Sequence, residues 1–161
     1  MNAGKLAFAA ALTLGATMAA AQQPPIPQYG PNITLEQARK ATAAADAEAR
    51  KNGWPMAIAI VDNAGQLVHF QRSDNTQTGS ILISQDKAVS SAMLRRSSKA
   101  IQDGVAGGGA GLRLLGLRYA SPVEGGLPIF IDGKIVGGIG VSGMAGDQDG
   151  VVAKAGADAV K

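Results

Sequence analysis

Residues 126–143 contain two runs rich in β-branched residues on either side of an Asp-Gly pair. An Asp-Gly pair can adopt the positive φ angles of a type I′ turn, so the pattern predicts a β-hairpin that turns at Asp132 and Gly133. The predicted turn fixes the pairing of the strands and sets Phe130 opposite Ile135 and Ile129 opposite Val136.

The returning strand of this hairpin has an unusual number of positions without a side chain. They are Gly137, Gly138, Gly140 and Gly143. Glycine inside a strand indicates that something approaches the backbone closely. We expect another backbone, a neighbouring subunit or a flat ligand to lie against this strand.

A second hairpin is predicted earlier in the chain. Residues 55–61 and 66–72 have strand composition, and the turn-forming sequence Asp62-Asn-Ala-Gly65 joins them. Simple pairing of these strands sets His69 opposite Ile58.

Four segments have the apolar spacing or the capping residues of helices. Thr34 and Gln37 form a possible capping box for a helix that ends before Gly53. Ser97 is placed to cap a short helix that ends at Gly104. The four predicted helices span residues 35–52, 80–93, 98–104 and 147–160.

Residues 104–123 are the least regular part of the pattern. Residues 104–111 are so rich in glycine that we expect a mobile loop, and residues 112–123 suggest a turn of helix and then a short strand. The predicted order is α-β-β-α-α-β-β-β-α. Consecutive hairpins make this an α+β domain, with an antiparallel sheet of about five strands flanked by helices.

The first 21 residues have the features of a secretory signal peptide. Lys5 precedes an apolar run over residues 6–18, and three alanines follow at 19–21. We therefore expect an exported protein, periplasmic or secreted, with no membrane segment after cleavage. The proline-rich residues 22–31 predict a linker or arm, and residues 32–161 one domain.

The composition of the chain excludes several kinds of site and one class of partner. The chain has no cysteine, which excludes disulfides, thiolate metal sites and covalently attached c-type haem. Its formal charge is +3, or +2 without Lys5, and only 4% of residues are aromatic. Nucleic-acid binding is therefore not expected.

Five ordered motifs resemble the GlcG/HbpS family, the haem-degrading or DUF336 domain that also forms the C-terminal part of PduO-type proteins. They are the sequences at 59–68, 70–74, 84–88, 125–129 and 137–143, the last followed by Gln148-Asp149. The resemblance spans nearly the whole mature domain. It implies a profilin-like α/β sandwich, a homo-oligomer between dimer and octamer, and binding of haem or another small ligand. The chain departs from the family pattern at His69 and at Ser73-Asp74-Asn75.

Haem needs an axial donor, and His69 is the obvious candidate because it is the chain's single histidine. Arg72, near it on the same strand, is a candidate partner for a propionate. Thr76 and Thr78 are weaker candidates for oxygen ligation, and their ordinary role is turn and helix capping. The alternative for His69 is a half-exposed strand residue without a ligand.

Other positions are candidates for ligand contact or chemistry. Lys87 is either a buried base or iminium former, or a solvated lysine on a helix face. Gly126, Pro128 and Gly143 belong to the predicted ligand edge of the hairpin. Asp62 and Asp132 are most simply turn residues.

Three functions follow from these residues. The first is an exported oligomeric protein that binds haem or a related tetrapyrrole in a pocket at a subunit edge. The second is an enzyme that transfers protons on a small organic acid through Lys87 or His69, with Arg72 holding the carboxylate. The third is a structural or sensor-partner protein, suggested by the proline-rich arm and the alanine-striped helices.

Overall fold

The structure, a computed structural model, describes residues 25–160. The predicted signal peptide at 1–21 and the start of the predicted arm lie outside the described residues. The elements in chain order are α1 (Leu35–Lys51), β1 (Ala57–Asp62), β2 (Leu67–Arg72), α2 (Ser80–Leu94), α3 (Ser98–Ala106), the 3-10 helix η1 (Gly109–Gly116), β3 (Gly126–Ile131), β4 (Lys134–Ser142) and α4 (Gly146–Asp158).

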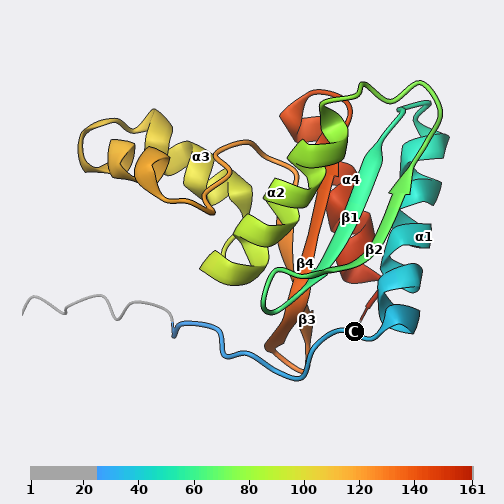
Figure 1. Ribbon diagram of the computed structural model, residues 1–161, viewed down its shortest axis with the longest axis horizontal. Helices are drawn as coiled ribbons and strands as arrows, with labels where there is room; N and C mark the ends of the chain where they lie inside the picture. The colour runs from blue at the N-terminus through green and yellow to red at the C-terminus, as the bar shows by residue number, and fades with distance from the viewer. Residues whose placement is uncertain (1–24, 161) are drawn as a thin grey trace, which may run out of the picture.

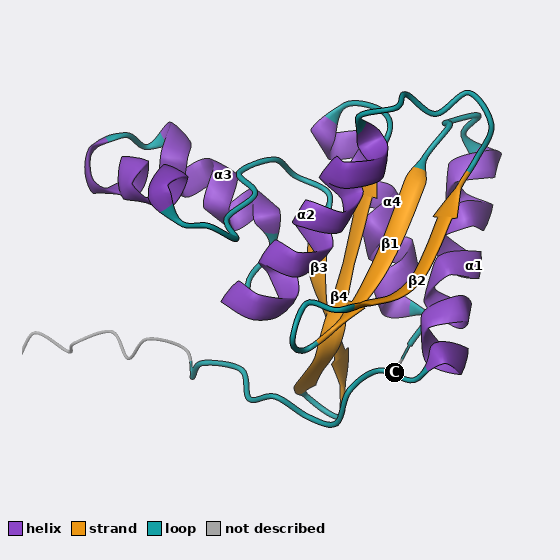
Figure 2. Ribbon diagram, in the orientation of Figure 1, coloured by secondary structure: helices purple, strands orange, loops and turns teal. Residues whose placement is uncertain are grey.

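The strands form one antiparallel sheet in the order β2-β1-β4-β3 (Figure 2). Helices α1 and α4 cover one face, and α2 covers the other, while α3 and the segment after it project sideways (Figure 1). The α+β class is confirmed. The fifth strand is wrong, because the sheet has four strands among the described residues.

The glycine-rich residues 104–111 are not the loop that the sequence predicted, because they contribute to α3 and η1. A Cβ on Gly111 would lie 1.8 Å from the carbonyl oxygen of Gly104, and a Cβ on Gly104 would lie 2.8 Å from Leu114 Cδ1. The glycines therefore allow α3 and η1 to pack against each other. The sequence predicted a mobile loop over residues 104–111 and then a turn of helix and a short strand over residues 112–123. The turn of helix agrees with η1, whereas the described residues form no strand between η1 and β3.

The predicted helix starts are confirmed. The Thr34 hydroxyl accepts from the Gln37 amide at 3.2 Å, and the Gln37 side chain accepts from the Thr34 amide at 2.9 Å. The Ser97 hydroxyl accepts from the Ala100 amide at 3.1 Å. Each cap satisfies backbone donors that the first turn of its helix leaves without a partner.

The turn between β3 and β4 is as predicted, but the register beyond it is only partly so. Asp132 has φ 50° and Gly133 has φ 73°, as a type I′ turn requires. Phe130 does lie opposite Ile135. A bulge before Phe130 then shifts the pairing, so that Ile129 lies opposite Gly137 and not Val136.

The hairpin of β1 and β2 also differs from simple pairing. His69 lies opposite Ile60, and the predicted partner Ile58 lies opposite Gln71. The register shifts between Ile60 and Val61, where the strand enters the turn. Asp62 is a turn residue as expected, because its Oδ1 accepts from the amides of Ala64 and Gln66, each at 2.9 Å.

Helix α2 occupies the space above the glycines of β4. A Cβ on Gly138 would lie 2.6 Å from the Ala88 carbonyl oxygen, and one on Gly140 would lie 2.0 Å from that of Ser84. Another backbone, one of the three expected neighbours, therefore lies against this strand. Strand β4 is also central in the sheet, so this glycine strip is not a free edge for a ligand.

Candidate functional site

His69 lies on β2, an edge strand, with its side chain toward α1. Its Nδ1 is 3.0 Å from the hydroxyl of Thr42, a buried α1 residue. That hydroxyl donates its proton to the Ala38 carbonyl at 2.9 Å. Since the Thr42 proton is already used, Nδ1 of His69 is the donor in the contact with Thr42.

This contact sets the chemistry of the imidazole. With the proton on Nδ1, a neutral ring has its lone pair on Nε2. Within the part of the chain that the structure describes, Nε2 has no hydrogen-bond partner and is not enclosed. A histidine that binds a metal usually donates its other ring N–H to a protein acceptor, as His69 does here.

Arg72 and His69 do not lie together. They are three residues apart on a regularly paired strand, so they belong to opposite faces of β2. Arg72 is exposed at the end of the strand. A planar ligand on the His69 face therefore does not reach Arg72 across that face.

The two threonines of the following loop differ from each other. The Thr76 hydroxyl donates to the Ser73 carbonyl at 2.8 Å and lies 3.1 Å from the Ser73 hydroxyl. Thr76 thus stabilises the turn after β2. Thr78 is exposed, just before α2.

Lys87 is buried, and the expected alternative of a solvated lysine is wrong. Its side chain is 1% exposed, and its Nζ donates to Asp149 Oδ2 at 2.7 Å and to the Val141 carbonyl at 2.9 Å. Asp149 also accepts from the Met144 amide at 3.1 Å. The pair joins α2 to the start of α4 and leaves Lys87 no open path to a substrate.

The charge of this pair is costly because it is far from water. Burial raises the pKa of Asp149 above its ordinary value of 3.8, although the bonds from Lys87 and from the Met144 and Gly143 amides act in the other direction. The sequence showed Asp149 only as an acid near a helix start. No local spacing indicates a partner for Lys87 that lies more than fifty residues away.

The three candidate residues from the hairpin at 126–143 have separate environments. A Cβ on Gly126 would lie 2.4 Å from the Lys87 carbonyl oxygen, and one on Gly143 would lie 2.1 Å from that of Pro55. Both glycines are therefore needed for close backbone packing. Pro128 lies on the edge strand β3, where a missing N–H is tolerated, and it lines a cavity.

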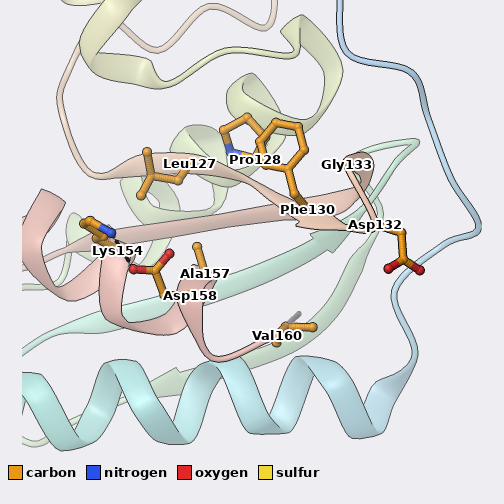
Figure 3. Close-up of a pocket in the computed structure, with 9 residues that line it drawn as sticks. All are labelled: Leu127, Pro128, Phe130, Asp132, Gly133, Lys154, Ala157, Asp158 and Val160. Atoms are coloured by element: carbon orange, nitrogen blue, oxygen red, sulfur yellow. Dashed lines mark hydrogen bonds and ion pairs between the residues drawn. The ribbon is translucent and has the colours of Figure 1, made fainter.

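That cavity has a volume of about 500 Å³ and lies between β3, its turn and the end of α4 (Figure 3). Leu127, Pro128 and Phe130 provide apolar surface, and the ion pair of Lys154 with Asp158 lies on the α4 side. Among the described residues, no histidine, methionine or tyrosine lines it. The cavity suits a small apolar molecule, but it offers iron no axial donor of those kinds.

Across residues 25–160, no three His, Cys, Asp or Glu side chains gather closely enough to hold a metal ion. None of the described helices is both long and apolar enough to cross a bilayer. The contacts of His69, the Lys87–Asp149 pair and the lining of the cavity place these candidates in three separate parts of the fold.

Residues 33–158 match the family of haem degrading proteins described as HbpS-like. The chain belongs to this family. Protein GlcG of Escherichia coli K12 is 38% identical over 110 residues, which cover 68% of this chain and 81% of GlcG. The resemblance to the GlcG/HbpS family is thereby confirmed.

Solved structures of relatives agree with the fold. The crystal structure of HbpS has a TM-score of 0.76 and 28% identity, covering 88% of this chain and 99% of HbpS. The complex of PduOC with haem has a TM-score of 0.73 and 23% identity, covering 81% of this chain and 96% of PduOC. At that identity, the second likeness shows the fold alone.

Proposed function

We propose that this HbpS-like protein binds haem or a related tetrapyrrole through Nε2 of His69. The observation that carries the proposal is the contact of Nδ1 with Thr42, because it orients the ring and leaves Nε2 as a lone-pair donor. The match of residues 33–158 to the family of haem degrading proteins described as HbpS-like supports the choice of ligand.

His69 has the donor chemistry that haem requires, and its place on an edge strand decides how a ligand would lie. A bound haem would supply iron, with its redox and ligand-binding chemistry. The chain would supply the axial imidazole, and the Thr42 hydroxyl would hold that ring in one orientation. Because β2 is at the edge of the sheet, a second subunit can cover the other side of the ligand, in keeping with a pocket at a subunit edge.

The test is a haemin titration of the mature chain, residues 22–161, followed by the Soret absorbance. We expect saturable binding at micromolar haemin, a changed Soret band in His69→Ala, and binding weakened by roughly 10- to 100-fold in Thr42→Val. Gln71→Ala is the matched control, because Gln71 is two residues along β2 on the same face.

The outcomes of the titration distinguish whether the protein binds haem from whether His69 is the residue that holds it. If the unchanged protein shows no saturable binding, the haem proposal is wrong. If His69→Ala binds haemin with the same affinity and spectrum as the unchanged protein, haem binds but His69 is not its axial donor.

We also propose a homo-oligomer. Large apolar side chains are exposed on and after η1, including Leu115 at 60% and Leu117 at 49%. Apolar surface of this kind commonly marks contacts between proteins. Light scattering should give a mass above that of one chain, and Leu115→Glu should reduce it. A single-chain mass for the unchanged protein would contradict this.

Export is the third part of the proposal, supported by the signal-like sequence of residues 1–21. Cell fractionation should place the protein outside the cytoplasm, with mass spectrometry showing an N-terminus at Gln22. A cytoplasmic protein that starts at Met1 would contradict export.

The two alternative functions receive different support. The enzyme hypothesis loses Lys87 as a proton-transfer group, since the side chain is buried and bound to Asp149. It retains His69, whose half-buried ring is closer to solvent. The sensor-partner hypothesis gains no specific contact from the structure and needs a co-purified protein to support it.

A further inference from the structure

A second large cavity lies on the α2 side of the molecule, away from the α1-facing side chain of His69. Its volume is about 630 Å³. It lies where the proline-rich segment passes the end of α2 and the first turn of α3. Its walls include Pro25–Pro27, Met93, Leu94, Arg95 and Arg96.

The wall formed by the proline-rich segment is held in place by specific bonds. The Tyr29 hydroxyl lies 3.0 Å from the Ala92 carbonyl oxygen and 3.1 Å from that of Met93, both acceptors. Arg95 Cζ lies 4.2 Å from the centre of the Tyr29 ring, and its Nη1 donates to the Pro27 carbonyl at 3.2 Å. Next along the chain, Gly30 and Gln28 make backbone bonds to Ile135, each 2.8 Å. The cavity is therefore formed before any ligand arrives.

The cavity is positively charged. Of residues 25–160, Arg95 and Arg96 line the cavity and no acidic residue does. Neither arginine forms an ion pair with a carboxylate in that range. Arg96 is exposed, and among the described residues it uses only Nε, which donates to the Leu94 carbonyl at 3.2 Å. Its two terminal nitrogens are available to a carboxylate in the bidentate manner.

The remaining walls are apolar. Ile26, which is 70% exposed, and Leu94 provide aliphatic surface beside these guanidinium groups. The volume falls in the range of small-molecule sites, which are mostly apolar with a few convergent polar groups. A ligand that matches both features has an apolar body and a negative charge at one end.

We propose that this cavity binds an amphipathic carboxylate, with its apolar body on Ile26 and Leu94 and its carboxylate on Arg96. The site is separate from His69, so the proposal does not depend on the haem proposal. Haem itself carries carboxylates, and an aliphatic acid is the other source of the same chemistry.

Calorimetric titration of the mature chain with decanoate tests the site. Decanoate should bind saturably, whereas acetate, which lacks the apolar body, and decyltrimethylammonium, which has the opposite charge, should not. Arg96→Gln should weaken decanoate binding by about tenfold or more. The matched control is Arg113→Gln, an exposed arginine on η1 outside the cavity, which should leave binding unchanged.

A second variant tests the site even if Arg96→Gln fails to fold. Ile26→Glu changes a mostly exposed side chain and places a negative charge in the cavity, so it should abolish decanoate binding while the circular dichroism spectrum stays the same. If Arg96→Gln and Ile26→Glu both bind decanoate as tightly as the unchanged protein, the inference is wrong. It is equally wrong if decyltrimethylammonium binds as well as decanoate.

Haemin titrations of the same variants distinguish the two sources of the carboxylate. Haemin binding that is weakened by Arg96→Gln and unaffected by His69→Ala supports this cavity as the tetrapyrrole site and contradicts the His69 proposal. Decanoate binding in a protein that does not bind haemin supports the cavity and contradicts the haem proposal alone.

Discussion

The buried pair of Lys87 and Asp149 allows a sharp prediction about stability. Lys87→Met removes the ammonium that lies 2.7 Å from Asp149 Oδ2 and leaves a carboxylate whose residue is 2% exposed. Breaking a buried pair by removing one partner costs about 3–5 kcal/mol. At the lower end, this cost lowers the melting temperature by about 6–12 °C.

The pH dependence of this loss identifies its cause. Burial already raises the pKa of Asp149, and without Lys87 it rises further because a favourable charge is gone. The folded variant therefore holds the Asp149 proton more tightly than the unfolded chain does. Its stability relative to the unchanged protein is therefore highest below the ordinary carboxyl pKa of 3.8, and this advantage is lost as pH rises through the folded pKa.

Urea denaturation at pH 4.5 and at pH 7.5 measures this difference. The free energy of unfolding lost in Lys87→Met should be larger at pH 7.5, and adding Asp149→Asn should recover part of it there, because the buried charge is removed. Equal losses at the two pH values, together with no recovery in the double variant, would refute the reasoning.

Three further predictions concern local structure, each measured as the free energy of unfolding in urea. Gly140→Ala should destabilise the fold by about 1–3 kcal/mol, since its Cβ would lie 2.0 Å from the Ser84 carbonyl oxygen, whereas Gly116→Ala, with nothing within 4 Å, should change stability by under about 0.5 kcal/mol. Similar effects of the two would contradict the close packing of α2. Thr34→Ala should cost about 1 kcal/mol by removing the α1 cap, and a silent substitution would contradict the capping box. Asp132→Ala should destabilise the hairpin more than Asp132→Asn, because asparagine tolerates the φ of 50° better than alanine; the reverse order would contradict the turn type.

Short-range patterns predicted much of the fold. The α1 capping box, the Ser97 cap and the turn at Asp132 depend on residues within a few positions of each other, so their chemistry is visible in the sequence. The same is true of the turn that Asp62 forms with its own neighbours. The ordered motifs were also enough to indicate the family.

Where the predictions were wrong, irregular strand pairing or packing between elements decided the outcome. Bulges shifted both hairpin registers, and they changed the partners of Ile129 and His69. The glycines at 104 and 111 serve the packing of α3 on η1, and the sequence does not distinguish such glycines from those of a loop.

The sequence by itself determined the helix starts, the hairpin turns and the presence of a glycine-rich strand, β4. Only the tertiary structure decided that α2 packs against the glycines of β4. It also decided that Lys87 pairs with Asp149 and that Thr42 contacts His69. The reason is physical. A cap or a turn is satisfied by backbone groups a few residues away, whereas burial and side-chain pairing depend on which surfaces meet when the helices pack on the sheet.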